Sequence, residues 1–257
     1  MSDLQEDQYP TEGITLSLCG DCFFYSGPAM TCGSVKDTIG ISHPQEHDHG
    51  TGSNITNYVV LGPRSHYFRC TRPRGGDVAA INNSDLEDYE GLVEFLDEHD
   101  VERPEILSLG VNGHYFIRAE NGEEKWDLPA KVARTLFAGS APASSASPVD
   151  SVWLGSCDAF VAQRKDGSRI VELHGQYPGL EATLLRTSRV LAMAMNLQDG
   201  VGYAVLWDGT MQCEPGMLRM ESGRALRRFC DANGVTLEGV VVGCIACPQP
   251  AGGAGTT

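Results

Sequence analysis

A chain of 257 residues with a formal net charge of −15 can bury a full hydrophobic core, but it repels nucleic-acid phosphates and anionic membrane surfaces. Its composition, 41% hydrophobic and 21% charged, is that of an ordinary globular protein. No run reaches the roughly 18 apolar residues of a membrane span. We therefore expect no nucleic acid and no membrane as partner, and another protein instead.

Residues 1–13 are acidic and lack the apolar segment of a signal peptide. We predict a disordered tail here and a cytoplasmic protein, with a nuclear location also compatible. Thiols in that compartment are mostly reduced. The nine cysteines are an odd number, so an intrachain disulfide framework cannot use them all.

The segment Ile14–Tyr25 reads as a strand pair joined by a turn between Cys19 and Cys22. Such a turn presents two thiolates on one side, as zinc-binding knuckles do, and His43 and His47 follow in a His-rich loop. The spacing Cys-x2-Cys-x20-His-x3-His is close to that of zinc sites and predicts a structural zinc. The competing interpretation is a pair of cysteines that fill a hairpin beside a mobile loop.

The most informative stretch is Ile106–Leu128, which reads as strand, turn, strand, turn, strand, with a helix beginning at Pro129. The dipeptides Asn112-Gly113 and Asn121-Gly122 are strong hairpin signals because both residue types tolerate positive φ. Similar phrases recur along the chain. Their aromatic residues, spaced 43 to 48 residues apart, are Phe24, Tyr67, Tyr115, Phe160 and Tyr203.

This period predicts five β-β-β-α units of about 45 residues, because one unit cannot bury its apolar face alone. We expect a mainly β fold with short helices, arranged as a closed five-bladed propeller-like ring. The alternatives are an open array of such units and a two-layer α+β domain.

A capping box, Ser84-Asp-Leu-Glu87, predicts the start of a helix with an acidic, solvated outer face. Its expected buried stripe is Leu86, Tyr89, Leu92, Val93 and Leu96.

The domain organisation follows from these units. Repeats one to three span 14–137, an Ala/Ser/Pro-rich linker or loop spans 138–148, and repeats four and five with a closing strand span 149–247. The closing strand, Val235–Ile245, is expected to pair with the first unit and seal the ring. The tail 248–257 is rich in Gly, Ala and Pro and is predicted to be disordered.

The part Val152–Asp231 resembles an uncharacterised, mostly fungal family of strand-turn-strand repeat proteins. The resemblance is carried by the phrases at residues 152–161, 173–180 and 203–209. These motifs consist of turn glycines, strand aromatics and helix prolines. The family has no assigned activity and no defined catalytic residues, so the resemblance supports the repeat and adds no function.

The sequence contains no P-loop, dinucleotide fingerprint, nucleophile elbow or His-Glu-x-x-His motif. Cys157 and His174 form the one nucleophile–base pair worth naming, and nothing in the sequence brings them together. We therefore expect a non-catalytic protein-interaction or scaffold module. The alternatives are a zinc-stabilised adaptor, an enzyme of unknown class, and a carbohydrate-binding repeat protein that uses Trp126, Trp153 and Trp207 as stacking faces, although their strand positions favour the core.

Overall fold

A computed structural model of the protein describes residues 15–19, 22–26, 31–33, 54–73, 81–137, 147–219 and 221–238. In these residues the chain is mainly β with four short α-helices, as the sequence predicts. The strands form five small sheets, and every strand pairing is antiparallel except one. No helix in this part of the chain is long and apolar enough to cross a membrane.

Each sheet is built from strands that are consecutive in the sequence. The first contains β1 (Thr15–Cys19), β2 (Cys22–Ser26) and β3 (Thr31–Gly33), and the second contains β4 (Asn54–Leu61), β5 (Tyr67–Pro73) and β6 (Ile81–Asp85). The third contains β7 (Pro104–Leu109), β8 (Tyr115–Ala119) and β9 (Glu124–Asp127), and the fourth contains β10 (Val149–Leu154), β11 (Phe160–Arg164) and β12 (Arg169–Glu172). The fifth contains β13 (Ala192–Met195), β14 (Tyr203–Trp207), β15 (Thr210–Cys213) and β16 (Thr236–Glu238).

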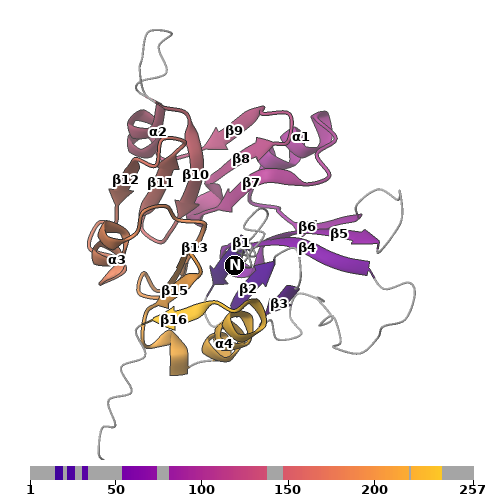
Figure 1. Ribbon diagram of the computed structural model, residues 1–257. Coiled ribbons are helices and arrows are strands. Elements are labelled where there is room, and N and C mark those ends of the chain that lie inside the picture. Colours follow the sequence, from indigo (N-terminus) through magenta and orange to yellow (C-terminus); the bar gives the residue numbers. More distant parts are fainter. Residues whose placement is uncertain are drawn as a thin grey trace, which may run out of the picture.

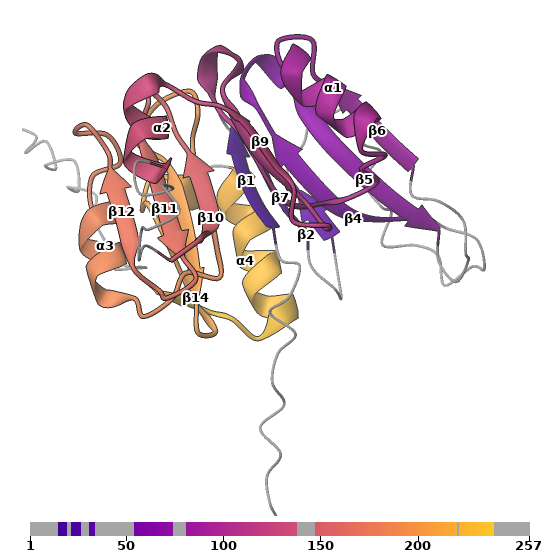
Figure 2. The same ribbon diagram turned by 90° about the horizontal axis from the view of Figure 1, so that it is seen from above.

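A helix follows the third strand of each sheet from the second to the fifth. These helices are α1 (Glu90–Glu98), α2 (Ala130–Phe137), α3 (Leu180–Arg186) and α4 (Glu221–Asn233). Figure 2 shows α1 and α3 at opposite ends of the molecule, with α4 between the sheets. The order strand, strand, strand, helix thus occurs four times in the described residues.

The start of α1 differs from the prediction. Ser84 does not cap a helix, because it lies in β6 opposite Phe68, and α1 begins at Glu90 without a side-chain cap. Pairing with β5 occupies the backbone around Ser84, so a long-range contact overrides the local capping pattern. The buried side chains are Leu86, Tyr89, Leu92 and Phe95, whereas Val93 is exposed.

The loops between the first and second strands of sheets two, three and four share one conformation. Each begins at a glycine whose N–H donates to the carbonyl oxygen four residues later: Gly62 to His66 (2.8 Å), Gly110 to His114 (2.7 Å) and Gly155 to Ala159 (2.8 Å). The third loop residue has a left-handed backbone in all three: Arg64 (φ 55°), Asn112 (φ 58°) and Cys157 (φ 51°). The Asn112-Gly113 signal therefore marks a turn correctly, but the loop has five residues rather than two.

The strand register shows which residues correspond between sheets. The last residue of each first strand from β4 onward pairs with an aromatic residue: Leu61 with Tyr67, Leu109 with Tyr115, Leu154 with Phe160 and Met195 with Tyr203. In the first sheet Leu18 pairs with Phe23. The sequence repeat places this aromatic residue one position later, at Phe24. Four residues separate Leu18 from Phe23, whereas five separate the corresponding residues in sheets two to four and seven in sheet five.

The first strands lie beside one another. β1 neighbours β4 and β13, β4 neighbours β7, β7 neighbours β10, and β10 neighbours β13. In Figure 1 the strands of the fourth sheet run from β12 on the outside to β10 on the inside, and the third sheet runs likewise from β9 to β7. In the described residues, no hydrogen-bonded strand pair joins one sheet to another, so each sheet remains separate.

Hydrogen bonds connect successive sheets near the ends of the first strands. The Leu61 N–H donates to Ser17 Oγ (2.6 Å), and the Leu154 N–H donates to Ser108 Oγ (3.1 Å). Two buried tyrosines make further connections: Tyr89 Oη donates to the Gly110 carbonyl (2.7 Å) and Tyr177 Oη to the Asn196 carbonyl (2.6 Å). Serine therefore links the first sheet to the second and the third to the fourth, and tyrosine makes the links in between.

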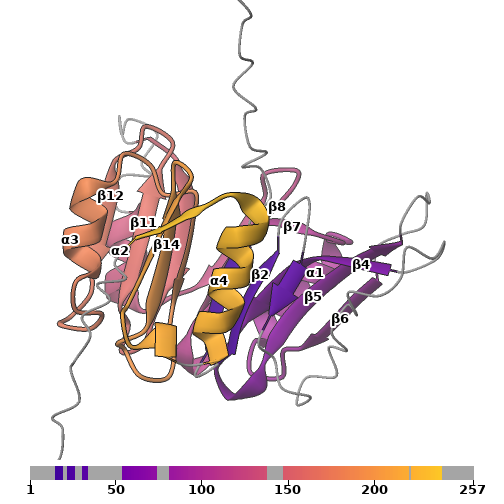
Figure 3. The same cartoon turned by 60° about the horizontal axis from the view of Figure 1, so that its bottom comes forward.

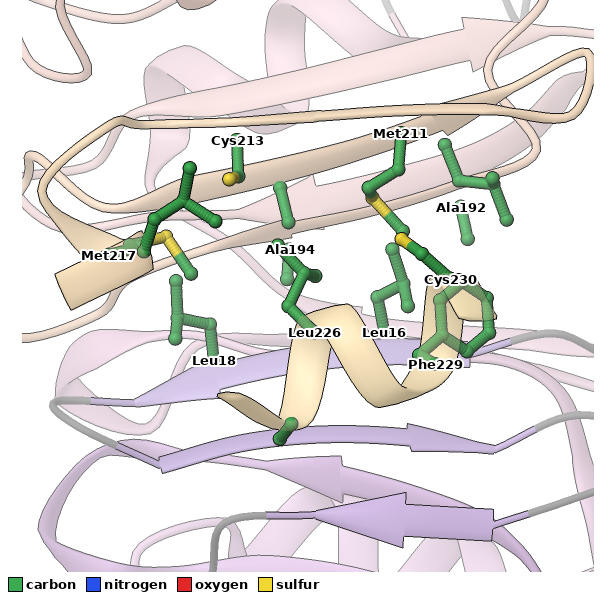
Figure 4. Packing of buried hydrophobic residues seen from close by; sticks show 14 residues of the cluster. Leu16, Leu18, Ala192, Ala194, Met211, Cys213, Met217, Leu226, Phe229 and Cys230 are labelled. Atoms are coloured by element: carbon green, nitrogen blue, oxygen red, sulfur yellow. The ribbon is translucent and has the colours of Figure 1, made fainter. Parts of the chain in front are cut away.

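Sheets five and one meet through an apolar cluster that includes α4 (Figures 3 and 4). Leu16 and Leu18 of β1 pack with side chains of β13, β15 and α4, among them Ala192, Met211 and Phe229. In the described part of the predicted closing strand, β16 runs parallel to β15 within the fifth sheet and pairs with no strand of the first. The part of that segment from residue 239 onward lies outside the described residues.

Candidate functional site

A cavity of about 410 Å³ lies between the first strands of all five sheets. This volume is within the range of about 300–1,000 Å³ typical of small-molecule sites. Each of these strands is an edge strand of its own sheet, and edge strands present backbone N–H and C=O groups that their sheet does not use. The walls can therefore offer hydrogen bonds to a small polar molecule.

Three of the wall strands carry a β-bulge at the same place. The strand register shifts between Thr56 and Tyr58 in β4, between Pro104 and Ile106 in β7, and between Val149 and Ser151 in β10. The extra residue is in each case four positions before the last residue of its strand, and these residues are Asn57, Glu105 and Asp150. A bulge redirects side chains and is often found beside a functional site.

The bulges supply two of the four charged residues that line the cavity. Glu105 and Asp150 are bulge residues, and Arg103 and Arg189 each lie six positions before the end of a first strand. All four stand near the beginning of a first strand, so they gather at the same end of the cavity. We call this group the mouth residues.

Asp150 and Arg189 neutralise each other across sheets four and five. Arg189 Nη2 lies 2.9 Å from Asp150 Oδ2. The buried side chain of Gln163 supports the pair, because its Nε2 donates to Asp150 at 3.4 Å and to the Val190 carbonyl at 3.1 Å. The Val190 N–H in turn donates to Gln163 Oε1 at 2.9 Å. The amide thereby fixes β10 relative to the segment that carries Arg189.

Arg103 has a different environment. Its guanidinium carbon lies 5.6 Å from the centroid of the buried Tyr58 ring, a cation–π arrangement. Burial raises the pKa of Tyr58, and the nearby Arg103 opposes that shift. Within the described residues, no carboxylate lies within 4.0 Å of this guanidinium. The side chain is half-buried, so its charge is only partly hydrated.

Glu105 is exposed and has one distant cationic neighbour. Its carboxylate lies 4.0 Å from Arg118 Nη1, whereas the Arg118 Nη2 atom lies only 2.6 Å from Glu124. Arg118 is therefore held mainly by Glu124, and Glu105 keeps acceptor capacity for a ligand donor.

A second polar cluster lies on the loop of the second sheet. His66 Nε2 is 3.1 Å from Asp88 Oδ2, and Arg64 Nη1 is 3.0 Å from the same oxygen. His66 Nδ1 lies 3.5 Å from Asp85. His66 is buried at the end of the loop, and these contacts hold the loop against the segment before α1. We therefore interpret this polar cluster as a structural support of the loop rather than as a binding site.

The predicted zinc ligands are largely beyond what the structure describes. The backbone register places Cys19 opposite Cys22 at the ends of β1 and β2, as a tight turn requires. Their side chains, and all of His43 and His47, lie outside the described residues. In the described part of the chain, no group of three or more His, Cys, Asp and Glu side chains could hold a metal ion. The zinc site stays a prediction.

Cys157 and His174 both lie on the surface of the fourth unit. Cys157 is exposed in the loop after β10, and His174 Nε2 lies 3.9 Å from Glu172. Both residues are described, and no hydrogen bond or ion pair in that part of the chain joins them. The geometry gives no support to a nucleophile–base pair.

The three tryptophans divide into two groups. Trp153 and Trp207 pack against a buried cluster, as their strand positions predict. Trp126 is 42% exposed on the edge strand β9, with its ring centroid 4.7 Å from that of Phe137.

The mouth residues are absent from the sequence-based candidates. A signal for them does exist: when the chain is aligned on the ends of the first strands, Arg103 coincides with Arg189, and Glu105 with Asp150. Without the register, however, these positions are ordinary charges at strand starts.

No known family model matches the chain, and neither does any curated protein or solved structure. The resemblance of Val152–Asp231 to a fungal family therefore stays a prediction.

Proposed function

We propose that the protein is a non-catalytic binding module in which five repeated units form a closed ring, and that its main binding site is the central cavity. The observation that carries this proposal is the convergence of all five first strands on one cavity of about 410 Å³ with charged residues at its mouth. The recurring loop hydrogen bonds and the recurring bulge position support a repeated unit. The neighbour relations from β1 through β4, β7 and β10 to β13, and back to β1, support closure.

The test is a screen of small polar fragments against the full chain by NMR. We expect saturable binding at one site, with shifts concentrated on amides of β1, β4, β7, β10 and β13. Ser151, which lines the cavity, supplies the blocking variant: Ser151→Tyr should abolish these shifts. The matched control is Ser168→Tyr, on the exposed turn between β11 and β12. Binding that maps elsewhere, or that survives Ser151→Tyr in a folded protein, contradicts the proposal.

A protein-binding surface is the second candidate, and Trp126 favours it. This indole stands exposed on β9, an edge strand of its sheet, and stacks on Phe137. An exposed edge strand with an aromatic anchor suits an extended peptide that adds a strand to the sheet. Trp126→Ala should remove such a partner, or a bound sugar, while cavity binding remains. Retained partner binding in this variant excludes the β9 surface.

The zinc-stabilised adaptor is a separate proposal that rests on the sequence spacing alone. Elemental mass spectrometry of the purified protein tests it. About one zinc per chain, lost in Cys19→Ser, would support it; a metal-free folded protein would end it.

A further inference from the structure

We infer that Arg103 anchors an anion-binding subsite at the mouth of the central cavity, and that the cavity takes a small polar organic anion. This inference rests on the proposed binding role of the cavity and adds the chemical class of its ligand. It follows from a comparison of two corresponding junctions between sheets.

The first junction, between sheets four and five, is neutral. Arg189, six positions before the end of β13, pairs at 2.9 Å with Asp150, four positions before the end of β10. An arginine at the start of one sheet is thus neutralised by the bulge residue of the preceding sheet.

The corresponding junction between sheets two and three lacks that neutralisation. Arg103 lies six positions before the end of β7, as Arg189 does relative to β13. The bulge position of the preceding strand β4 holds Asn57, whose amide carries no charge. In the described residues, Arg103 meets the Tyr58 ring at 5.6 Å and no carboxylate within 4.0 Å. Arg103 thus occupies the strand position that Arg189 has in sheet five, but in the described residues no carboxylate of the preceding sheet pairs with it.

A half-buried guanidinium without a carboxylate suits an anionic ligand. Burial reduces the hydration of the charge, so an anion that reaches it gains a strong interaction. The planar guanidinium can hold a carboxylate or a phosphate through two parallel hydrogen bonds. Contact with Tyr58 restricts the side chain, so less conformational freedom is lost when the anion binds.

The other groups that line the cavity indicate which further chemical groups the ligand carries. The cavity is bounded by edge strands, which offer backbone donors and acceptors, and Glu105 can accept a hydrogen bond from a ligand hydroxyl. Hydroxyl groups next to the anionic group would match these partners. The net charge of −15 repels anions at long range, so binding must come from contacts inside the cavity, where salt screens less.

Three probes with one carbon skeleton test the inference on the full chain by calorimetry and by the Arg Nε–H signals in NMR. Gluconate carries a carboxylate, glucose 6-phosphate carries a phosphate, and glucose carries no charge. We expect at least one of the two anions to bind saturably at millimolar concentration and more tightly than glucose. The preferred anion identifies whether the ligand is a carboxylate or a phosphate.

Arg103→Gln is the decisive variant, and Arg186→Gln, at the exposed end of α3 and outside the cavity lining, is its control. Loss of a charge-assisted contact should weaken the bound anion by roughly tenfold or more in Arg103→Gln. The control removes the same charge from an arginine that does not line the cavity and whose Nη2 donates to Gln212 Oε1 (2.8 Å), and it should change affinity by less than about threefold. Circular dichroism and the melting temperature establish that both variants fold.

Two outcomes would overturn the inference. Equal weakening in the two variants would show a general charge effect, and the absence of saturable binding by either anion would remove the subsite. If glucose binds as tightly as gluconate and Arg103→Gln leaves both unchanged, the cavity still binds small molecules and only the anion subsite fails. The Ser151→Tyr experiment decides the cavity itself independently.

Discussion

The junction between sheets four and five and the junction between sheets five and one are held in different ways. At the first, the buried Tyr177 hydroxyl accepts a hydrogen bond from the Ser156 N–H (2.7 Å) and donates one to the Asn196 carbonyl (2.6 Å). At the second, apolar and sulfur-containing side chains of β1, the fifth sheet and α4 pack into one cluster (Figure 4). Sheets four and five are thus joined through their own loops, whereas sheets five and one are joined through a cluster that includes the C-terminal helix α4.

The largest effect is expected where α4 enters the apolar cluster between sheets five and one. Phe229 is 1% exposed there, and Phe229→Ala should lower the free energy of unfolding by about 3–5 kcal/mol through lost burial and a cavity. Urea denaturation measures this loss. In this variant, hydrogen exchange should also rise at β1 before it rises at β11, because the contact between sheets five and one opens first.

The control for Phe229 is Leu185→Ala on α3, since Leu185 is 82% exposed. Its free energy of unfolding should change by less than about 0.5 kcal/mol. A loss in Phe229→Ala as small as this would mean that α4 does not hold sheets five and one together.

Loss of the hydrogen bonds that Tyr177 and Tyr89 make between sheets should cause the next largest losses of stability. Tyr177→Phe leaves the Ser156 N–H and the Asn196 carbonyl without their partner and should cost about 1–3 kcal/mol. Tyr89→Phe removes the donor of the hydrogen bond to the Gly110 carbonyl and should also cost about 1–3 kcal/mol. Urea denaturation measures both losses, and a change below about 0.5 kcal/mol in either variant would contradict the structural role of its hydroxyl.

The apolar cluster between sheets five and one contains Cys213 and Cys230, and its contribution to the free energy of unfolding should fall at high pH. Burial raises the pKa of both Cys213 and Cys230 to about 12, from an ordinary value of 9.0. The folded state therefore holds these protons more tightly than the unfolded state, so stability is fully present below about pH 9 and falls as the pH rises towards 12.

Tyrosines titrate in the same range, since burial also raises the pKa of Tyr115 to about 12. The measurement is therefore the pH dependence of unfolding in the Cys213→Ala, Cys230→Ala double variant relative to the parent protein. We expect a shallower decline in the variant. An unchanged slope would show that the two thiols do not contribute.

The smallest losses of stability are expected for the hydrogen bonds that Ser17 and Ser108 accept between sheets. Ser108→Ala removes the acceptor of the Leu154 N–H, and Ser17→Ala removes that of the Leu61 N–H. Each should lower the free energy of unfolding by about 1 kcal/mol. Ser168→Ala on an exposed turn is the matched control and should lie near zero. If a serine variant costs as much as Phe229→Ala, the order of the junctions proposed above is wrong.

Several local features of this protein are determined by the sequence alone. Strand alternation and the signals at Asn112-Gly113 and Pro129 locate the elements of the third sheet, because strands and turns depend on neighbouring residues. The recurrence of aromatic residues likewise predicts the middle strands. In the first sheet it misplaces this residue by one position, at Phe24, because the length of the loop differs between sheets, which only strand pairing reveals.

The tertiary structure decided the rest. Ser84 belongs to a strand rather than a helix cap because β5 pairs with it, and β16 joins the fifth sheet rather than the first. The candidate site depends on the same kind of contact: Asp150 and Arg189 are 39 residues apart, and β-bulges bring charged side chains to the mouth of one cavity. Pairing and register between distant strands depend on how whole sheets pack, so the local sequence around these residues does not specify them.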